Sequence, residues 1–174
     1  VLAARTVTRS NAPLTGYRLA VARNFMQDGL DSAVAAAFQR SLDRLRAAGV
    51  VVEDIDLPEL NELATLQATG GFSAAESYAW HRTLLKNHAD QYDPRVALRI
   101  QRGASMAASD YIDLTHARAD WVARMNAQLQ RFDAVLSPTV PIIAPPIAQV
   151  APGVERDEAF FKVNGQLLRN TNVV

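Results

Sequence analysis

The chain has 174 residues, enough for about one domain. Its residues are 49% hydrophobic and 21% charged, which is typical of a globular protein with a substantial core. This composition excludes a disordered chain. Eighteen basic and eighteen acidic residues give a formal net charge of zero, with no basic run to attract nucleic acid or an anionic membrane. Cysteine is absent, which excludes disulfides, thiolate metal sites and a cysteine nucleophile and is typical of a cytoplasmic protein.

Residues 16–56 predict a βαβ unit. A strand over 17–22 is followed by a helix that Asp31 can cap, since its side chain accepts hydrogen bonds from free backbone N–H groups. Gly49 ends this helix, and a second strand follows over 50–56. Apolar residues recur along the helix at spacings of three and four: Val34, Phe38, Leu42 and Leu45. Such units cross over right-handedly and place their two strands parallel.

Residues 57–132 have a helical pattern throughout. A short helix over 60–66 is expected to stop at Gly70, and Ser73 with Glu76 predicts a capping box that begins the next helix. A further helix begins at Asp93-Pro94 and ends near Gly103, with Val96 and Ile100 expected on its buried side. The longest helix is predicted to begin at a Ser109 cap and to run to about Arg131.

Residues 133–174 combine a short strand, a proline-rich loop and a final helix. The strand is expected over 134–136, and five prolines between 138 and 152 predict an ordered loop, because proline cannot donate to a sheet. The final helix is expected over 158–168. The chain begins without Met and ends on the apolar pair Val173-Val174, from which we expect a piece of a larger protein.

Motifs of known chemistry are absent. The sequence has no G-x-S-x-G turn, no S-x-x-K, no phosphate-binding glycine loop and no histidine pair spaced for zinc. Glu53, Asp54 and Asp56 lie together at a strand end, where they form either a solvated edge or a cation site. We expect no catalytic residue among these groups, no metal and no cofactor.

Longer segments resemble the amidase signature family. The matching segments, in order, are Arg99-Ile100-x-x-Gly103 followed by Ser109-x-Tyr111, then Phe132–Thr139 with Val140-Pro141 and Ala144-Pro145, then Asn164 and Leu168-Arg169-Asn170-Thr171-Asn172. They are similar to the family's R-I-x-x-G helix pair, its F-D-v-l-l-s-P-T-x-P-x-x-A-P segment and its N…L-R-N-T segment. The resemblance covers residues 16–174.

The resemblance implies a mixed-sheet α/β fold of which residues 1–174 form a C-terminal portion, comprising the βαβ unit (16–56), the helical region (57–132) and the remainder (133–174). It also implies hydrolysis of amide bonds by a Ser–cis-Ser–Lys triad. The family carries that triad in a glycine- and serine-rich stretch that precedes the matching region. This chain has no Ser-Ser dipeptide, so no triad residue is carried over to it.

The resemblance also implies two substrate-binding positions. In the branch that delivers ammonia for transfer-RNA charging, the arginine of the R-I helix contacts the substrate carboxylate, and Arg99 matches it. The same branch binds the substrate amino group with an aspartate, which Gln166 replaces here, so glutamine-like substrates are not expected. The other interpretation of Arg99 is a helix-end arginine in a surface ion pair.

Two function classes follow. The first is an amide hydrolase, with a small-molecule amide as substrate and the missing N-terminal half of the protein as partner; exposed sheet edges would also permit a homo-oligomer. The alternative is a non-catalytic α/β interaction module, which fits the lack of a catalytic group. Nucleic acid and membrane are not expected as partners.

Overall fold

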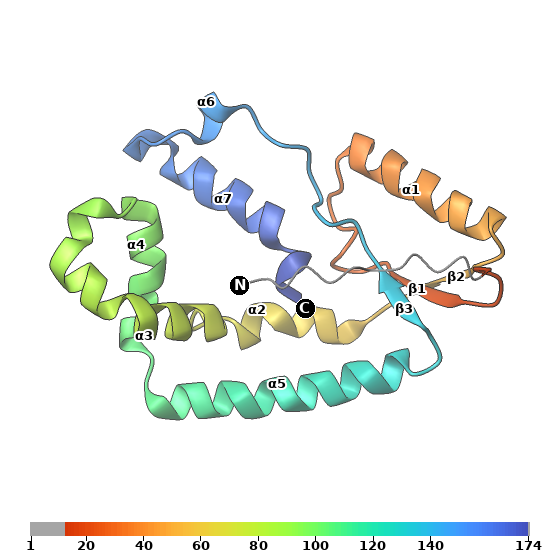
Figure 1. The fold of residues 1–174 in the computed structure, drawn as a ribbon, viewed down its shortest axis with the longest axis horizontal. Coiled ribbons are helices and arrows are strands. Elements are labelled where there is room, and N and C mark those ends of the chain that lie inside the picture. The colour runs from red at the N-terminus through yellow and green to blue at the C-terminus, as the bar shows by residue number, and fades with distance from the viewer. Residues whose placement is uncertain (1–12, 174) are drawn as a thin grey trace.

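The computed structural model describes residues 13–173 and contains a parallel sheet beside an array of helices (Figure 1). Strands β1 (Arg18–Ala22) and β2 (Val51–Ile55) pair in parallel and are joined by helix α1 (Ser32–Ala47). Strand β3 (Ala134–Leu136) pairs in parallel with the other edge of β1, which gives the order β2-β1-β3. The βαβ unit and the α/β fold class are therefore confirmed.

Helix α1 begins as its sequence predicts. The Asp31 carboxylate accepts a hydrogen bond from the Ala33 N–H at 2.8 Å. Arg44 and Arg46 lie in the last turn, where positive charge stabilises the helix C-terminus. Figure 1 shows α1 on one side of the sheet, and α5 and the helices after β2 on the other.

The segment between β2 and β3 is helical, as predicted. Its elements are η1 (Pro58–Glu62), α2 (Leu63–Leu66), α3 (Gly71–His88), η2 (Ala89–Gln91), α4 (Pro94–Gln101), η3 (Arg102–Ser105) and α5 (Ala108–Leu129). Helix α5 runs beside α2 and α3 and returns the chain to the sheet (Figure 1).

The predicted cap of α3 is wrong. The helix begins at Gly71, and its N-cap is Gly70, whose φ of 106° is a left-handed conformation that glycine adopts without strain. Gly70 therefore turns the chain into the helix before Ser73 is reached. The Ser73 hydroxyl lies in the first turn and donates to the Gly70 carbonyl at 3.4 Å.

The cap of α5 also differs from the prediction, whereas that of α4 is confirmed. Helix α5 begins at Ala108, and the Asp110 carboxylate accepts the Ala107 N–H at 2.9 Å, so Ser109 lies within the first turn. In α4, the Asp93 carboxylate accepts the Arg95 N–H at 2.8 Å.

The segment after β3 contains one helix that the proline pattern concealed. Helix α6 (Ile147–Val150) follows Pro146, because these four residues are free of proline and keep their N–H groups. The chain continues through η4 (Val154–Arg156) and α7 (Asp157–Leu168) to η5 (Thr171–Val173).

The main core cluster lies between the sheet, η1, α2 and α5. Its buried members are Ala22, Met26, Leu57, Leu60, Leu63, Trp121 and Met125. The Trp121 Nε1–H donates to the Glu59 carbonyl at 2.8 Å, so the indole is buried with its polar atom satisfied. This cluster fixes α5 against the segment after β2, and the candidate site lies beside it.

Candidate functional site

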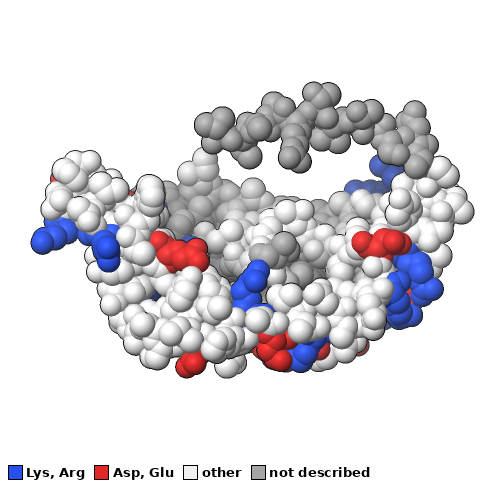
Figure 2. Space-filling view, turned by 60° about the horizontal axis from the view of Figure 1, so that its bottom comes forward, with Lys and Arg blue, Asp and Glu red and all other residues white. Residues whose placement is uncertain are grey.

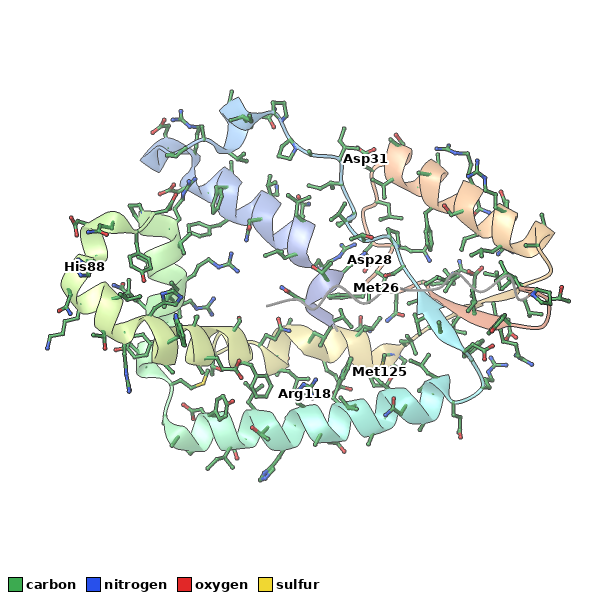
Figure 3. The ribbon with its side chains drawn as sticks, viewed as in Figure 1. Met26, Asp28, Asp31, His88, Arg118 and Met125 are labelled. Atoms are coloured by element: carbon green, nitrogen blue, oxygen red, sulfur yellow. The ribbon has the colours of Figure 1, made fainter. Side chains whose placement is uncertain are left out.

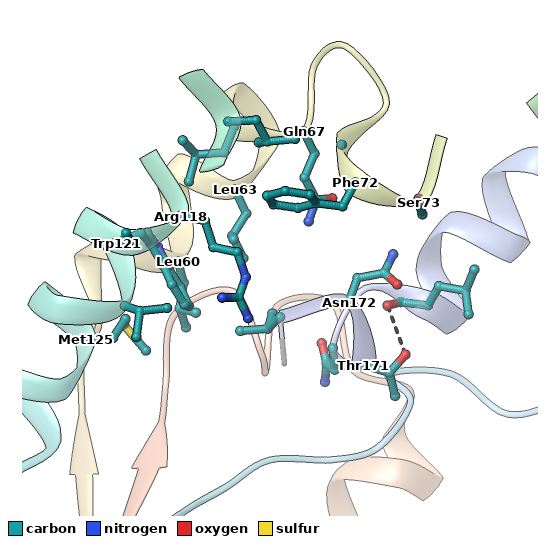
Figure 4. Close-up of a pocket in the computed structure, with 18 of the residues that line it drawn as sticks. Leu60, Leu63, Gln67, Phe72, Ser73, Arg118, Trp121, Met125, Thr171 and Asn172 are labelled. Carbon is teal, nitrogen blue, oxygen red and sulfur yellow. Dashed lines mark hydrogen bonds between the residues drawn. The ribbon is translucent and has the colours of Figure 1, made fainter. Parts of the chain in front are cut away.

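A groove of about 1330 Å³ lies between α2, the start of α3, α5 and the C-terminal segment around η5. Its floor is apolar and includes Leu60, Leu63, Trp121 and Met125 (Figure 4). Figure 4 also shows Arg118 extending from α5 into the groove. An apolar concavity with a few polar groups is the usual form of a small-molecule site.

The charged side chains on the described lining are Glu76, Arg99 and Arg118. Glu76 is engaged, because the Tyr111 hydroxyl donates to its Oε1 at 3.1 Å. This hydrogen bond raises the pKa of Tyr111, since it favours the protonated phenol. The Phe72 ring meets the Tyr111 ring edge-on, with centroids 5.4 Å apart. The Glu76 carboxylate offsets one of the two arginines, so the charged side chains of the described lining sum to one positive charge.

Arg99 lies on the groove lining, exposed near the end of α4. Residues 13–173 offer it no ion pair or side-chain hydrogen bond, whereas the ion-pair interpretation requires one. Its contact with substrate stays a prediction. The burial expected around it is partly wrong: Ile100 is buried, but Val96 is 48% exposed.

On α4 the side chain of Arg95 is buried, whereas the sequence predicts that Val96 is the buried residue. Arg95 is 9% exposed and donates to the Asp93 carboxylate at 2.9 Å and to the Val150 carbonyl at 3.2 Å. Its guanidinium also lies 4.0 Å from the centre of the Phe160 ring. An arginine with this many partners is held against α7, and the neighbouring Val96 turns outward.

Gln166 lies exposed on α7 and is not among the described residues that line the groove. The lining instead takes its C-terminal residues from further along the chain, at Leu168 and 170–173. The structure thus brings Arg99 to the groove and leaves Gln166 outside it. The substrate-binding role of Gln166 stays a prediction.

Arg118 is a lining residue that reasoning from the sequence missed. The signal was present, because Arg118 lies seven residues after Tyr111, four before Val122 and seven before Met125, on the apolar side of a long helix. A charged residue in such a stripe indicates a partner or ligand outside the helix. Thr171 and Asn172, also missed, place polar side chains across from Arg118 (Figure 4).

Glu53 of β2 forms two ion pairs at the sheet edge. Glu53 contacts Arg18 at 2.5 Å and Arg131 at 3.1 Å. Among residues 13–173, no group of three His, Cys, Asp or Glu side chains lies close enough together to hold a metal ion. On the face in Figure 2, basic and acidic side chains are interspersed. None of the described helices combines the length and apolarity that crossing a membrane requires.

The amidase family model matches residues 3–171. An amidase of Pseudomonas putida is 26% identical over 129 residues, which are 74% of this chain and 27% of that protein. The 2-amino-5-chloromuconic acid deaminase of Comamonas testosteroni is 27% identical over 162 residues, or 91% of this chain and 33% of that protein.

Solved structures have the same fold. Allophanate hydrolase of Kluyveromyces lactis superposes with a TM-score of 0.77 at 21% identity, over 92% of this chain and 25% of that one. The chain thus spans about a third or less of the curated relatives that it matches. Because the family model covers nearly every residue described above, the chain belongs to the amidase family.

Proposed function

We propose that this chain forms part of an amide hydrolase and supplies one wall of its substrate site. The observation that carries the proposal is the groove, in which an apolar floor meets Arg99 and Arg118. A guanidinium binds a carboxylate or carbonyl oxygen through a planar fork of N–H donors. The substrate that fits is a small amide with an apolar part and an exposed oxygen acceptor.

We propose that the nucleophile and base come from outside these 174 residues. The sequence has no Ser-Ser dipeptide, and its two lysines, Lys86 and Lys162, have no serine three residues before them. Amide hydrolysis by a serine requires a base within hydrogen-bond reach and donors for the developing oxyanion. This chain therefore orients the substrate, and other residues attack it.

Ammonia release from a panel of primary amides tests this function. The complete protein is expected to hydrolyse at least one member, and the 174-residue chain none. A serine-reactive phosphonate should label the complete protein stoichiometrically and leave the chain alone unlabelled. A complete protein that releases no ammonia and resists the phosphonate would favour the non-catalytic interaction module instead.

We also propose that the rest of an amidase-family domain covers the groove and extends the sheet. Val135 of β3 is 37% exposed and lines the groove with Ser137, and β3 lies at an edge of the described sheet. Such an edge offers unpaired backbone groups to another strand. The relatives are nearly three times as long as this chain and so contain enough further residues to fill this position.

Sedimentation velocity tests this arrangement. The 174-residue chain is expected to self-associate through the open edge and groove, and the complete protein to leave that surface closed. A chain that stays monomeric at high concentration and unfolds cooperatively would contradict the proposal.

We also propose a cytoplasmic location, which the absence of cysteine supports. Fractionation of cells that express the complete protein would test it.

A further inference from the structure

The strand order reverses between β1 and β3. From β1 the chain crosses through α1 to β2 on one side, and it later adds β3 on the other side. In open parallel sheets, ligands bind outside the carboxyl ends of the strands, in the crevice where the order reverses. Here that crevice lies between the segments that follow Ala22 and Leu136.

The Asn170 side chain fills this crevice. It is 3% exposed, and its Nδ2 donates to the Met26 carbonyl at 2.9 Å and to the Pro138 carbonyl at 2.8 Å. Its Oδ1 accepts from Arg169 Nε at 3.1 Å. A single amide therefore connects the segment after β1 to the segment after β3, with both of its donors satisfied.

Arg169 holds the same segment from the other side. Its guanidinium donates to the Asp28 carbonyl at 2.8 Å and to the Met26 carbonyl at 3.4 Å, and it lies 5.6 Å from the centre of the Phe25 ring. Phe25 has a φ of 62°, which a bulky residue adopts only where its surroundings impose it. Figure 3 shows Met26 and Asp28 beside the end of α7, where these contacts converge.

The segments that Asn170 connects also form one end of the groove. Met26, Ser137 and Asn170 belong to its lining, and Thr171 and Asn172 continue directly from Asn170 along the wall (Figure 4). The Thr171 hydroxyl donates to the Leu168 carbonyl at 3.1 Å, which fixes the start of η5. The position of this polar wall relative to the sheet therefore depends on the hydrogen bonds of Asn170.

We propose that Asn170, supported by Arg169, is a positioning residue that holds the polar end of the groove in register with the carboxyl ends of β1 and β3. The proposal rests on the proposed amide hydrolase function. The apolar floor and the arginines on α4 and α5 bind the substrate, and the Asn170 wall sets its orientation toward the attacking group. Small displacements in such a wall lower turnover more than binding.

Two variants of the complete protein test this role. Asn170→Ala removes all three hydrogen bonds of the side chain. Asn170→Asp keeps the shape of the side chain and the contact with Arg169, but it replaces the Nδ2 donor with an oxygen that cannot donate to the Met26 and Pro138 carbonyls. Both are expected to lower kcat about 10- to 100-fold and to change KM less than about threefold. Asp43→Ala is the control, since it removes only exposed side-chain contacts with Gln39 and Arg46 within α1 and should leave kcat and KM unchanged.

Hydrogen exchange supplies a readout that does not require activity. At a temperature well below unfolding, both Asn170 variants should speed exchange in 24–28 and 137–141 and at Thr171 and Asn172, while Asp43→Ala should affect only α1. Unchanged exchange in the Asn170 variants would overturn the proposal. Faster exchange with unchanged kcat would also overturn it, leaving Asn170 a stabilising residue. A wild-type protein without amidase activity would refute the proposed function separately.

Discussion

Gly103 packs directly against the backbone of Ala74, so that a Cβ on Gly103 would overlap the Ala74 carbonyl oxygen and lie 2.7 Å from the Tyr78 Cβ. This contact sets how closely η3 approaches α3 and thereby fixes the turn that carries α4. Because Arg99 lies on α4 and lines the groove, the absence of a side chain at Gly103 helps to place a candidate binding residue.

Gly103→Ala is expected to destabilise the protein by about 1–3 kcal/mol, because backbone atoms cannot move aside as a flexible side chain would. Gly165→Ala is the matched control, since Gly165 lies inside α7 and a Cβ added there would meet nothing within 4 Å. It should stabilise the helix by about 0.5–1 kcal/mol. Urea unfolding of both variants measures the difference, and equal midpoints would contradict the close contact.

Arg99→Ala in the complete protein is expected to raise KM about 10- to 100-fold with little change in melting temperature, since about 1.4 kcal/mol of lost binding is tenfold. Arg99→Lys should restore little, because lysine lacks the planar fork. Arg40→Ala, on α1, serves as an exposed-arginine control. A KM equal to that of the wild type would show that Arg99 does not bind the substrate and is a surface residue.

The lowered pKa of Asp93 leads us to expect a loss of folding stability in acid. Its hydrogen bonds with the Arg95 side chain and backbone N–H lower the pKa of the carboxyl from 3.8 to about 2. A carboxyl whose pKa is lower in the folded state stabilises that state above pH 3.8, and this contribution disappears as the pH falls through about 2. Asp93→Asn keeps a capping oxygen but cannot titrate, so its stability should fall less steeply between pH 4 and pH 2 in chemical unfolding. Parallel curves for the two proteins would refute the role of Asp93.

The open edge of β3 predicts where the isolated chain associates. Val135→Lys places a charge on the strand that borders the groove and should reduce self-association of the 174-residue chain. Val51→Lys places the same charge on β2, at the other edge of the sheet, where Val51 is 46% exposed. Sedimentation should show a smaller effect of Val51→Lys, and the reverse order would place the association surface at β2.

Elements with strong local signals could be predicted from the sequence. The βαβ unit, the Asp31 and Asp93 caps and the strand at 134–136 each depend on neighbouring residues, and the structure confirms them. The predicted caps at Ser73 and Ser109 are wrong because neighbouring residues determine where these two helices begin. Gly70 adopts a left-handed conformation before the first serine, and Asp110 bonds the free N–H beside the second.

The candidate site could be predicted only in part. Arg99 was found through the family resemblance, and Arg118 could have been found from its place in the apolar stripe of α5. The partners of Asn170 could not, since Met26 is 144 residues away and Pro138 is 32 residues away. Periodicity and spacing describe neighbours along the chain, and such contacts arise only when distant segments pack together.

The sheet closes late in synthesis. The Arg18 N–H donates to the Asp133 carboxylate at 2.7 Å, the Asp133 N–H donates to the Arg18 carbonyl at 2.8 Å, and these residues are 115 positions apart. At ribosomal speeds of roughly 5–20 residues per second, β3 is synthesised several seconds or more after β1, so one edge of β1 stays unpaired during that time. Throughout that interval the nascent chain presents an unpaired strand edge, which is where chaperones or misdirected strands would engage it first.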